Sequence, residues 1–576
     1  MDKKLSFLFI ALLVFGVGIG SASLQEAVDA SDNGYLIIMS GGTWNENVVI
    51  DDKDLTIMGS GAGETIISGE GTDDASVVTI DSADVALEGM TITNGNATSG
   101  GGISNRNDSH LTLEEVEVTG NTAKFGGGIY NSESTVTIVD SSISANTASY
   151  GGGIHNTEGT VMIEDSSISG NTASGSGGGI RNDNGTVSVK SSSISGNTAS
   201  GSGGGIFNYE KGTVTVEDSY ISGNTVSSGS GGGIYNNDGT VTVKDSSIFG
   251  NTALYYGGGI FTTYYGNVTI KDSIIDTNTA LIEGGGVYSI QASTVKLEET
   301  SVTRNIASTN GGGIFNRGST INIEDCSVTK NIALNDGGGI YNFGNSYITN
   351  SIVTINDSSI SDNIASNNGG GIYNYGTVTM EDSSVTKNTA DQAGGGISNH
   401  ELGTITMEDS SVTKNTADFG GGIFNYGTVT MEDSSVAKNT AALGGGIYNY
   451  LTGTITMEDS LVTKNTADLQ GGGIYNYGTV TMEDSSVAKN TAGQAGGGIY
   501  NYLIGTITME DSSVTKNTAD FGGGIFNYQG TITMNSDTRI TENQARFNGG
   551  GIFNEGGTIT YNGALVTSNT PNNIVP

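Results

Sequence analysis

The amino-acid sequence predicts an all-β fold, a right-handed parallel β-helix in which three short strands make one coil of about 26 residues. Three observations support this prediction. A motif of three glycines followed by Ile or Val returns through most of the chain, and each repeat holds three short segments rich in Val, Ile, Thr and Tyr. No repeat shows an apolar period of 3.6 residues, so a helical solenoid of similar repeat length is disfavoured.

The repeat is clearest from Gly471 to Ala492, where the chain reads GGGIYNYGTVTMEDSSVAKNTA. Its segments GGGIYN, GTVTMED and SSVAKNTA are bounded by Gly, Asn, Asp or Ser, as strands separated by turns are. One coil buries too few aliphatic side chains to offset the entropy of ordering its residues, so we expect nearly identical coils to stack and share a core. The motif begins, at intervals of 24 to 32 residues, at Gly100, Gly126, Gly151, Gly177, Gly203, Gly231, Gly257, Gly284, Gly311, Gly337, Gly369, Gly394, Gly420, Gly444, Gly471, Gly496, Gly522 and Gly549.

Variation among the repeats predicts which side chains face the core. The residue after the glycines is Ile or Val in every copy, whereas the next position holds aromatic residues in most copies but Arg181 or Ser398 in others. A position that accepts Arg and Ser must face outward, so alternation along the strand places Ile474 inside and Tyr475 outside. An Asn three residues beyond an inward Val is expected to form a corner, where stacked side chains bond coil to coil. These residues are Asn388, Asn415, Asn439, Asn465, Asn490 and Asn517.

Composition bounds the class of protein and its partners. The 576 residues include 93 Gly and 2 Pro with 35% hydrophobic residues, which is too apolar for a disordered tail. The 60 Asp and Glu against 22 Lys and Arg give a net charge of −38, which argues against binding to nucleic acid or to an anionic membrane. The single cysteine, Cys326, excludes an intramolecular disulfide framework and a cysteine-built metal site.

The first residues are typical of a secretory signal peptide. Two lysines precede the apolar run LSFLFIALLVFGVGIG and small residues follow, so we predict that residues 1–23 are a signal peptide cleaved after Ser23. An uncleaved membrane anchor is the alternative, although the run is short for a span. We expect no transmembrane segment after cleavage and a secreted or cell-surface location. The remainder divides into an N-terminal cap with the first coils, residues 24–99, and the GGGI-repeat β-helix, residues 100–576.

Two motifs carry a resemblance to a known family. The glycine-rich GGGI and an upstream apolar-x-x-Asn such as VTKN are similar to the GGAI and FxxN repeats of the polymorphic outer membrane protein family, within the pectin-lyase-like superfamily. The segment from Leu24 also resembles the opening of such β-helices, where a short capping helix precedes the first coils. The resemblance implies an adhesin-like protein of the cell surface or cell outer membrane, with surface glycans or proteins of another cell or matrix as partners.

A polysaccharide lyase or glycoside hydrolase on the same fold is the enzyme alternative, and a structural spacer or coat protein is a third interpretation. Catalysis needs paired carboxylates, or a metal with a basic group, gathered where the repeat symmetry breaks. Here Glu-Asp pairs recur coil after coil, and His110, His155 and His400 lie in distant repeats. We interpret His155 and His400 as solvated surface residues. We predict no catalytic, cofactor-binding or metal-binding residue and a protein that is not an enzyme.

The recurring Glu-Asp pairs raise the question of bound calcium. Like charges stacked about 4.8 Å apart repel each other, and a divalent cation would relieve that repulsion. The simpler interpretation is a turn, because Asp382 followed by Ser383 is typical of turns. We therefore expect no cofactor and leave calcium open as the alternative. The pairs begin at Glu381, Glu408, Glu432, Glu458, Glu483 and Glu510.

Outward aromatic residues form the candidate binding surface. In the predicted coils they make two adjacent columns on one face, where they could stack on sugars, enter a protein interface, or only stack on one another. The candidate binding residues of the first column are Tyr373, Phe424, Tyr448, Tyr475, Tyr500 and Phe526. The second column holds Tyr375, Tyr426, Tyr450, Tyr477, Tyr502 and Tyr528.

Overall fold

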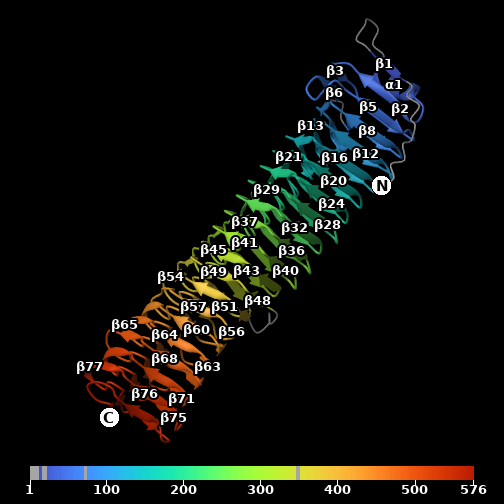
Figure 1. Ribbon diagram of the computed structural model, residues 1–576. Helices are drawn as coiled ribbons and strands as arrows, with labels where there is room; N and C mark the ends of the chain where they lie inside the picture. Colours follow the sequence, from blue (N-terminus) through green and yellow to red (C-terminus); the bar gives the residue numbers. More distant parts are fainter. Residues whose placement is uncertain (1–11, 16–22, 70–73, 345–350) are drawn as a thin grey trace. The chain divides into compact units, whose positions relative to one another are not determined.

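The computed structural model describes residues 12–15, 23–69, 74–344 and 351–576. The chain forms two compact units, unit 1 (Met1–Thr279) and unit 2 (Ala280–Pro576). In each unit the strands of one coil pair in parallel with those of the next, and the sheets run along the stack (Figure 1). Most of the predicted signal peptide lies outside the described residues, and cleavage after Ser23 stays a prediction.

Three main strands and one short strand make a coil. Each strand pairs in register with its counterpart in the next coil, so Ile474 lies beside Ile499 and Val480 beside Ile507. The predicted all-β parallel β-helix with three main strands per coil is confirmed, and the sequence missed only the short strand. In the repeat that begins at Gly471 the strands are β66 Ile474–Asn476, β67 Thr479–Glu483, β68 Ser486–Ala488 and the short β69 Thr491–Ala492.

The core of each coil consists of one inward face from each main strand. In the same repeat Ile474, Val480, Met482 and Val487 are completely buried, while Thr479 between the core positions is exposed. Each fully buried aliphatic side chain stabilises the fold by about 1.5–3 kcal/mol. The inward positions predicted from alternation are thus confirmed.

Two rows of buried Asn side chains run from coil to coil. In the corner row, Asn490 Nδ2 donates to the carbonyl of Val462 (2.9 Å) and to Oδ1 of Asn517 (3.0 Å), while its own Oδ1 accepts the backbone N–H of Asn465 (2.9 Å). In the second row, Asn476 Nδ2 donates to Oδ1 of the following Asn (2.9 Å). The predicted corner ladder is confirmed, and it satisfies backbone groups that the turn leaves unpaired.

The glycine triplet gives the backbone of the next coil room to approach. Gly471 has a φ of +67°, which a residue with a Cβ rarely adopts. A Cβ on Gly473 would lie 2.6 Å from the carbonyl oxygen of Gly498 and 2.9 Å from Nδ2 of Asn490. The motif recurs because each coil repeats this contact with the next.

A short helix covers the first coil. Helix α1 (Leu24–Ala30) buries Leu24, Ala27 and Val28, and Ser23 caps it by accepting the backbone N–H of Glu26 (3.0 Å). This agrees with the capping helix that the family resemblance implies. Without such a cap, the apolar interior of the first coil would face water.

The corner row of Asn side chains predicts a specific loss of stability. Replacing Asn490 with Ala leaves buried partners on two neighbouring coils without hydrogen bonds, and we expect the free energy of unfolding to fall by about 3 kcal/mol. Urea unfolding followed by circular dichroism measures this change. Thr491→Ala, at the exposed neighbouring position, is the control. Equal stability of the two variants would contradict the role given to this row.

Candidate binding surface

The aromatic columns lie on the outer face of the sheet formed by the GGGI segments. In unit 2 the strands that carry them pair in register, so aromatic residues of successive coils are neighbours. These strands are β51 Ile372–Asn374, β55 Ile397–Asn399, β58 Ile423–Asn425, β62 Ile447–Asn449, β66 Ile474–Asn476, β70 Ile499–Tyr502 and β74 Ile525–Tyr528.

The rings of the first column stack on one another, and we call this column the inner aromatic ladder. From Phe424 to Phe553 the centroids of successive rings are 4.6 to 5.5 Å apart, with interplanar angles of 4° to 21°. Tyr475 is only 6% exposed. The sequence placed this column outside the core correctly but was wrong to expect exposed rings. Phe424 is half-buried, and the buried candidate residues are Tyr373, Tyr448, Tyr475, Tyr500 and Phe526.

The inner aromatic ladder is buried because other side chains cover it. Ala495 and the half-buried Phe521 pack against it from the segments that precede the glycines. Burial raises the pKa of Tyr448 and of Tyr500 to about 12, so both phenols stay neutral near pH 7. Alternation specifies the face of a side chain but not what covers that face.

The second column, which we call the outer aromatic column, keeps part of its surface in water. Tyr450, Tyr477, Tyr502 and Tyr528 are half-buried and pack against the inner ladder. Their mutual contacts include an edge-on pair, Tyr477 and Tyr502, at 5.3 Å between centroids. The two predicted columns therefore exist, but only the outer one offers ring surface to a ligand along its whole length.

The inner ladder is interrupted at Ser398, which pairs in register with Tyr373 and Phe424. A recess of about 440 Å³ opens there. His400 leans over the ring of Tyr373 with 5.2 Å between centroids. Burial lowers the pKa of His400 although Glu401 opposes the shift, so its imidazole is neutral near pH 7. The walls of the recess include Ser398, His400, Phe419, Phe424, Tyr426 and Tyr448.

In unit 1 the same column includes a charged cluster that the sequence did not reveal. His155 Nε2 lies 2.9 Å from Oδ2 of Asp183, and Arg181 Nε donates to the same oxygen at 2.7 Å. Burial alone would raise the pKa of Asp183, but the hydrogen bonds and charges of His155 and Arg181 outweigh burial and lower it. The guanidinium of Arg181 lies between the rings of Tyr150 (4.8 Å) and Phe207 (5.0 Å).

The interpretation of His155 and His400 as solvated residues is therefore wrong. His155 is 4% exposed and His400 is half-buried among aromatic rings. His155 was missed because its partner, Asp183, lies 28 residues further along the chain. The sequence nevertheless contained an indication of this cluster. His155, Arg181 and Asp183 occupy positions of the two aromatic columns, in register with rings of neighbouring coils.

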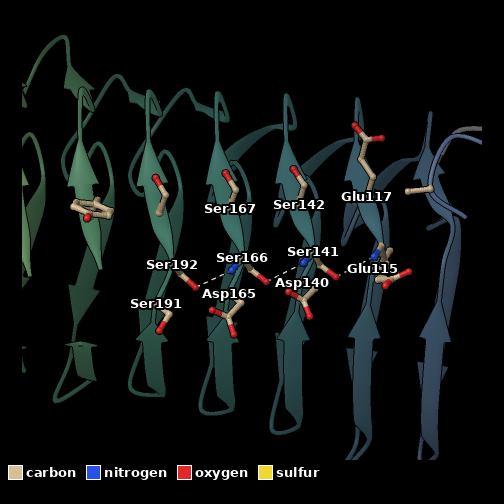
Figure 2. A pocket seen from close by; sticks show the side chains of 14 residues that line it. Glu115, Glu117, Asp140, Ser141, Ser142, Asp165, Ser166, Ser167, Ser191 and Ser192 are labelled. Carbon is tan, nitrogen blue, oxygen red and sulfur yellow. Dashed lines mark hydrogen bonds between the residues drawn. The ribbon is translucent and has the colours of Figure 1, made fainter. Parts of the chain in front are cut away.

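A second concavity of about 670 Å³ lies on unit 1 at the corner after the strands β16 Thr135–Val139 and β20 Thr160–Glu164. Figure 2 shows Asp140 and Asp165 beside a row of serines that are bonded from coil to coil. In this row the Ser166 hydroxyl accepts the backbone N–H of Ser141 (3.0 Å) and donates to the carbonyl of Glu164 (2.7 Å). The serines complete the corner, and no basic side chain lines this concavity in the described part of the chain.

The Glu-Asp pairs that recur from coil to coil lie at turns. Asp382 has a φ of +48°, and the equivalent Asp of the next five coils lie between +46° and +49°, which confirms the predicted turn. Among the described residues, no three His, Cys, Asp or Glu side chains gather so that they could hold a metal ion. Calcium binding by the Glu-Asp pairs stays an open alternative.

Two family models match parts of the chain. Residues 154–328 match the right handed beta helix region, and residues 357–375 match the Chlamydia polymorphic membrane protein repeat. The first match agrees with the structure, in which the described chain folds as a right-handed parallel β-helix. The resemblance carried by GGGI and VTKN is thus confirmed for the β-helix and for its repeat. Such repeats are associated with the outer surface, and they indicate a surface-exposed protein.

Other comparisons add little about the activity of this β-helix. The PL6 family alginate lyase AlyGC and a point mutant of it are each 11% identical to this chain, with 98% of this chain and 100% of theirs covered, at a TM-score of 0.25. This likeness is too low to support an argument, and the fold occurs in enzymes and non-enzymes. No protein of curated function matches. In the described part of the β-helix, no helix has the length and apolar character needed to cross a membrane.

The burial of the inner aromatic ladder predicts its contribution to stability. Replacing Tyr448, Tyr475 and Tyr500 together with Ser removes buried ring stacking, and we expect unit 2 to lose about 3 kcal/mol per site. Chemical unfolding measures the loss. The matched triple change in the outer column, Tyr450, Tyr477 and Tyr502 to Ser, is expected to cost far less. If both variants unfold at the same urea concentration, the distinction between the two columns is wrong.

We predict that the buried tyrosines of the inner aromatic ladder ionise at a higher pH than exposed tyrosines. The folded pKa of Tyr448 and of Tyr500 is raised above the usual value of about 10, so the stability they contribute is full below about pH 10 and is lost as the pH rises through about 12. Ultraviolet absorbance of tyrosinate should therefore show a class of tyrosines that ionises only above about pH 11 or on unfolding. Ionisation of every tyrosine near pH 10 in the folded protein would contradict this.

Proposed function

We propose that this β-helix is an exported, adhesin-like protein of the cell surface that binds glycans or proteins of another cell or matrix without catalysing a reaction. The observation that supports this is the outer aromatic column, a row of half-exposed tyrosines mounted on a buried ladder. Tyrosine offers a large contact area and a hydroxyl at a low entropic cost, which suits a recognition surface.

The surroundings of the outer aromatic column support the same function. Loops that follow the column place apolar side chains in water, including Leu402 (56% exposed) and Ile504 (68% exposed). In unit 1 the corresponding loop exposes Tyr264 and Tyr265. Exposed apolar and aromatic residues that gather along one face are typical of an interaction surface.

The candidate catalytic groups favour recognition over catalysis. The serines of the Figure 2 concavity bond to backbone groups, and its carboxylates have no His, Lys or Arg partner among the described lining residues. The carboxylate of Asp183 is bonded to both His155 and Arg181, so these groups neutralise one another. A polysaccharide lyase or hydrolase would need free acid and base groups that converge in a groove.

Binding experiments with the full chain test the proposal. We expect the wild type to bind glycans or cells, and replacement of Tyr450, Tyr477 and Tyr502 with Ser to weaken attachment by about tenfold or more while unit 2 stays folded. The control replaces the outward Thr456, Thr481 and Thr508 of the same coils with Ser and should bind like the wild type. Glycan arrays and cell-attachment assays measure the effect.

Three results would overturn this function. Unchanged attachment by the tyrosine variant, or no attachment by the wild type, would favour a structural spacer or coat protein. Depolymerisation of a polysaccharide panel, with or without calcium, would favour the enzyme if a single carboxylate or arginine substitution abolished the turnover.

A further inference from the structure

The inner aromatic ladder of unit 2 lacks one rung. Between residues 288 and 553, all of which the structure describes apart from 345–350, every coil contributes a ring to this column except the coil that carries Ser398. On one side of the gap Tyr341 and Tyr373 stack at 4.8 Å with an interplanar angle of 9°. On the other side the stack resumes at Phe424.

The gap has the height of one ring. Parallel strands are about 4.8 Å apart, so the flanking rungs lie about 10 Å apart, which is the space that an aromatic side chain at the register position of Ser398 would fill. The recess measures about 440 Å³, within the range of small-molecule sites. His400 lies against Tyr373 (5.2 Å between ring centroids) and Tyr375 (4.3 Å) and occupies that side of the gap, so the space left for a ligand is the side next to Phe424.

The bottom of the recess holds an unpaired hydroxyl. Ser398 is 1% exposed, and its Oγ has no hydrogen-bond partner among the described residues. A buried hydroxyl without a partner destabilises the fold, and the serines of the corner rows do not leave theirs unpaired. A ligand hydroxyl that displaces the side chains covering Ser398 would satisfy it.

Charge restricts the chemistry of the ligand. No acidic or permanently charged side chain lines the recess, and the imidazole of His400 is neutral near pH 7. Carboxylates close to the wall are Asp336, which accepts a hydrogen bond from Asn368 of the wall (2.9 Å), and three that adjoin wall residues in the chain, namely Asp391, Glu401 and Asp418. With a net charge of −38 on the chain, an acidic sugar would be repelled and would find no cation here.

We propose that the recess at Ser398 binds one neutral pyranose ring of a glycan. The C–H face of the sugar replaces the missing rung against Phe424, and a sugar hydroxyl pairs with Ser398. An aromatic side chain of a protein partner would fill the same space, but its ring would leave the Ser398 hydroxyl without a hydrogen bond. This inference rests on the proposed function, because it gives the glycan-binding face one specific site.

Two substitutions at Ser398 test the recess in the full chain. Ser398→Tyr inserts the missing rung, so we expect it to abolish binding and to leave the melting temperature equal or higher. Ser398→Ala keeps the recess open and removes one hydrogen bond, and we expect about three- to tenfold weaker binding. The probes are methyl glycosides and short oligosaccharides of neutral hexoses and N-acetylhexosamines, with uronic acid oligomers for comparison. Saturation-transfer NMR and calorimetry measure binding.

The matched control is Ser104→Tyr, the same substitution at the same register position of unit 1, where it should leave sugar binding unchanged. If the wild type binds a neutral glycan and both Ser398→Tyr and Ser398→Ala bind it with the same affinity, the glycan does not occupy the recess. The proposed function would still hold in that case. The recess proposal would also be wrong, and the proposed function would still hold, if the wild type bound only proteins or only uronic acid oligomers. A wild type that binds no glycan and no cell would overturn both.

Discussion

Each coil is fixed to the next by hydrogen bonds that allow only one register. Backbone pairing alone would tolerate a slip along the strand, but the two rows of buried Asn side chains do not. Asn490 bonds to backbone and side-chain groups on both neighbouring coils, and a shift by one residue would leave these groups buried and unpaired. The glycine triplet adds a steric condition, because the carbonyl of Gly498 occupies the space of any side chain at Gly473.

The same register determines what happens on the outer face. Equivalent residues of successive coils lie one above another at the strand spacing. Aromatic residues that recur at one position of the repeat therefore stack on one another. Tyr448 and Tyr475 are 4.6 Å apart for this reason. Distinct chemistry in such a molecule requires a departure from the repeat, and departures in this column of the described residues include Ser104, the cluster around Asp183 and the gap at Ser398.

The sequence was informative where a property depends on the repeat itself. Strand order, the inward Ile474 and the corner Asn490 all follow from alternation and spacing, and all are confirmed. The exposure of Tyr448 could not be predicted in this way, because it depends on covering residues such as Phe419, which belongs to a different coil. The site residues themselves are untested as ligand contacts. Ser398 was visible in the sequence as the odd member of its column, but the recess depends on where His400 settles.

The cluster around Asp183 and the gap at Ser398 differ in what takes the place of the missing ring, and the difference supports a binding role for Ser398. In unit 1 the guanidinium of Arg181 takes the place of a ring against Phe207, and Asp183 compensates the charge. That rung is filled and its charge is neutralised, although Nδ1 of His155 and Oδ1 of Asp183 stay buried without a hydrogen-bond partner among the described residues. At Ser398 no side chain at this register position reaches Phe424, a recess remains and the hydroxyl is unpaired, so the fold gives up both stacking and a hydrogen bond. A ligand that restores both would recover that loss, and this is the physical argument for recognition at Ser398.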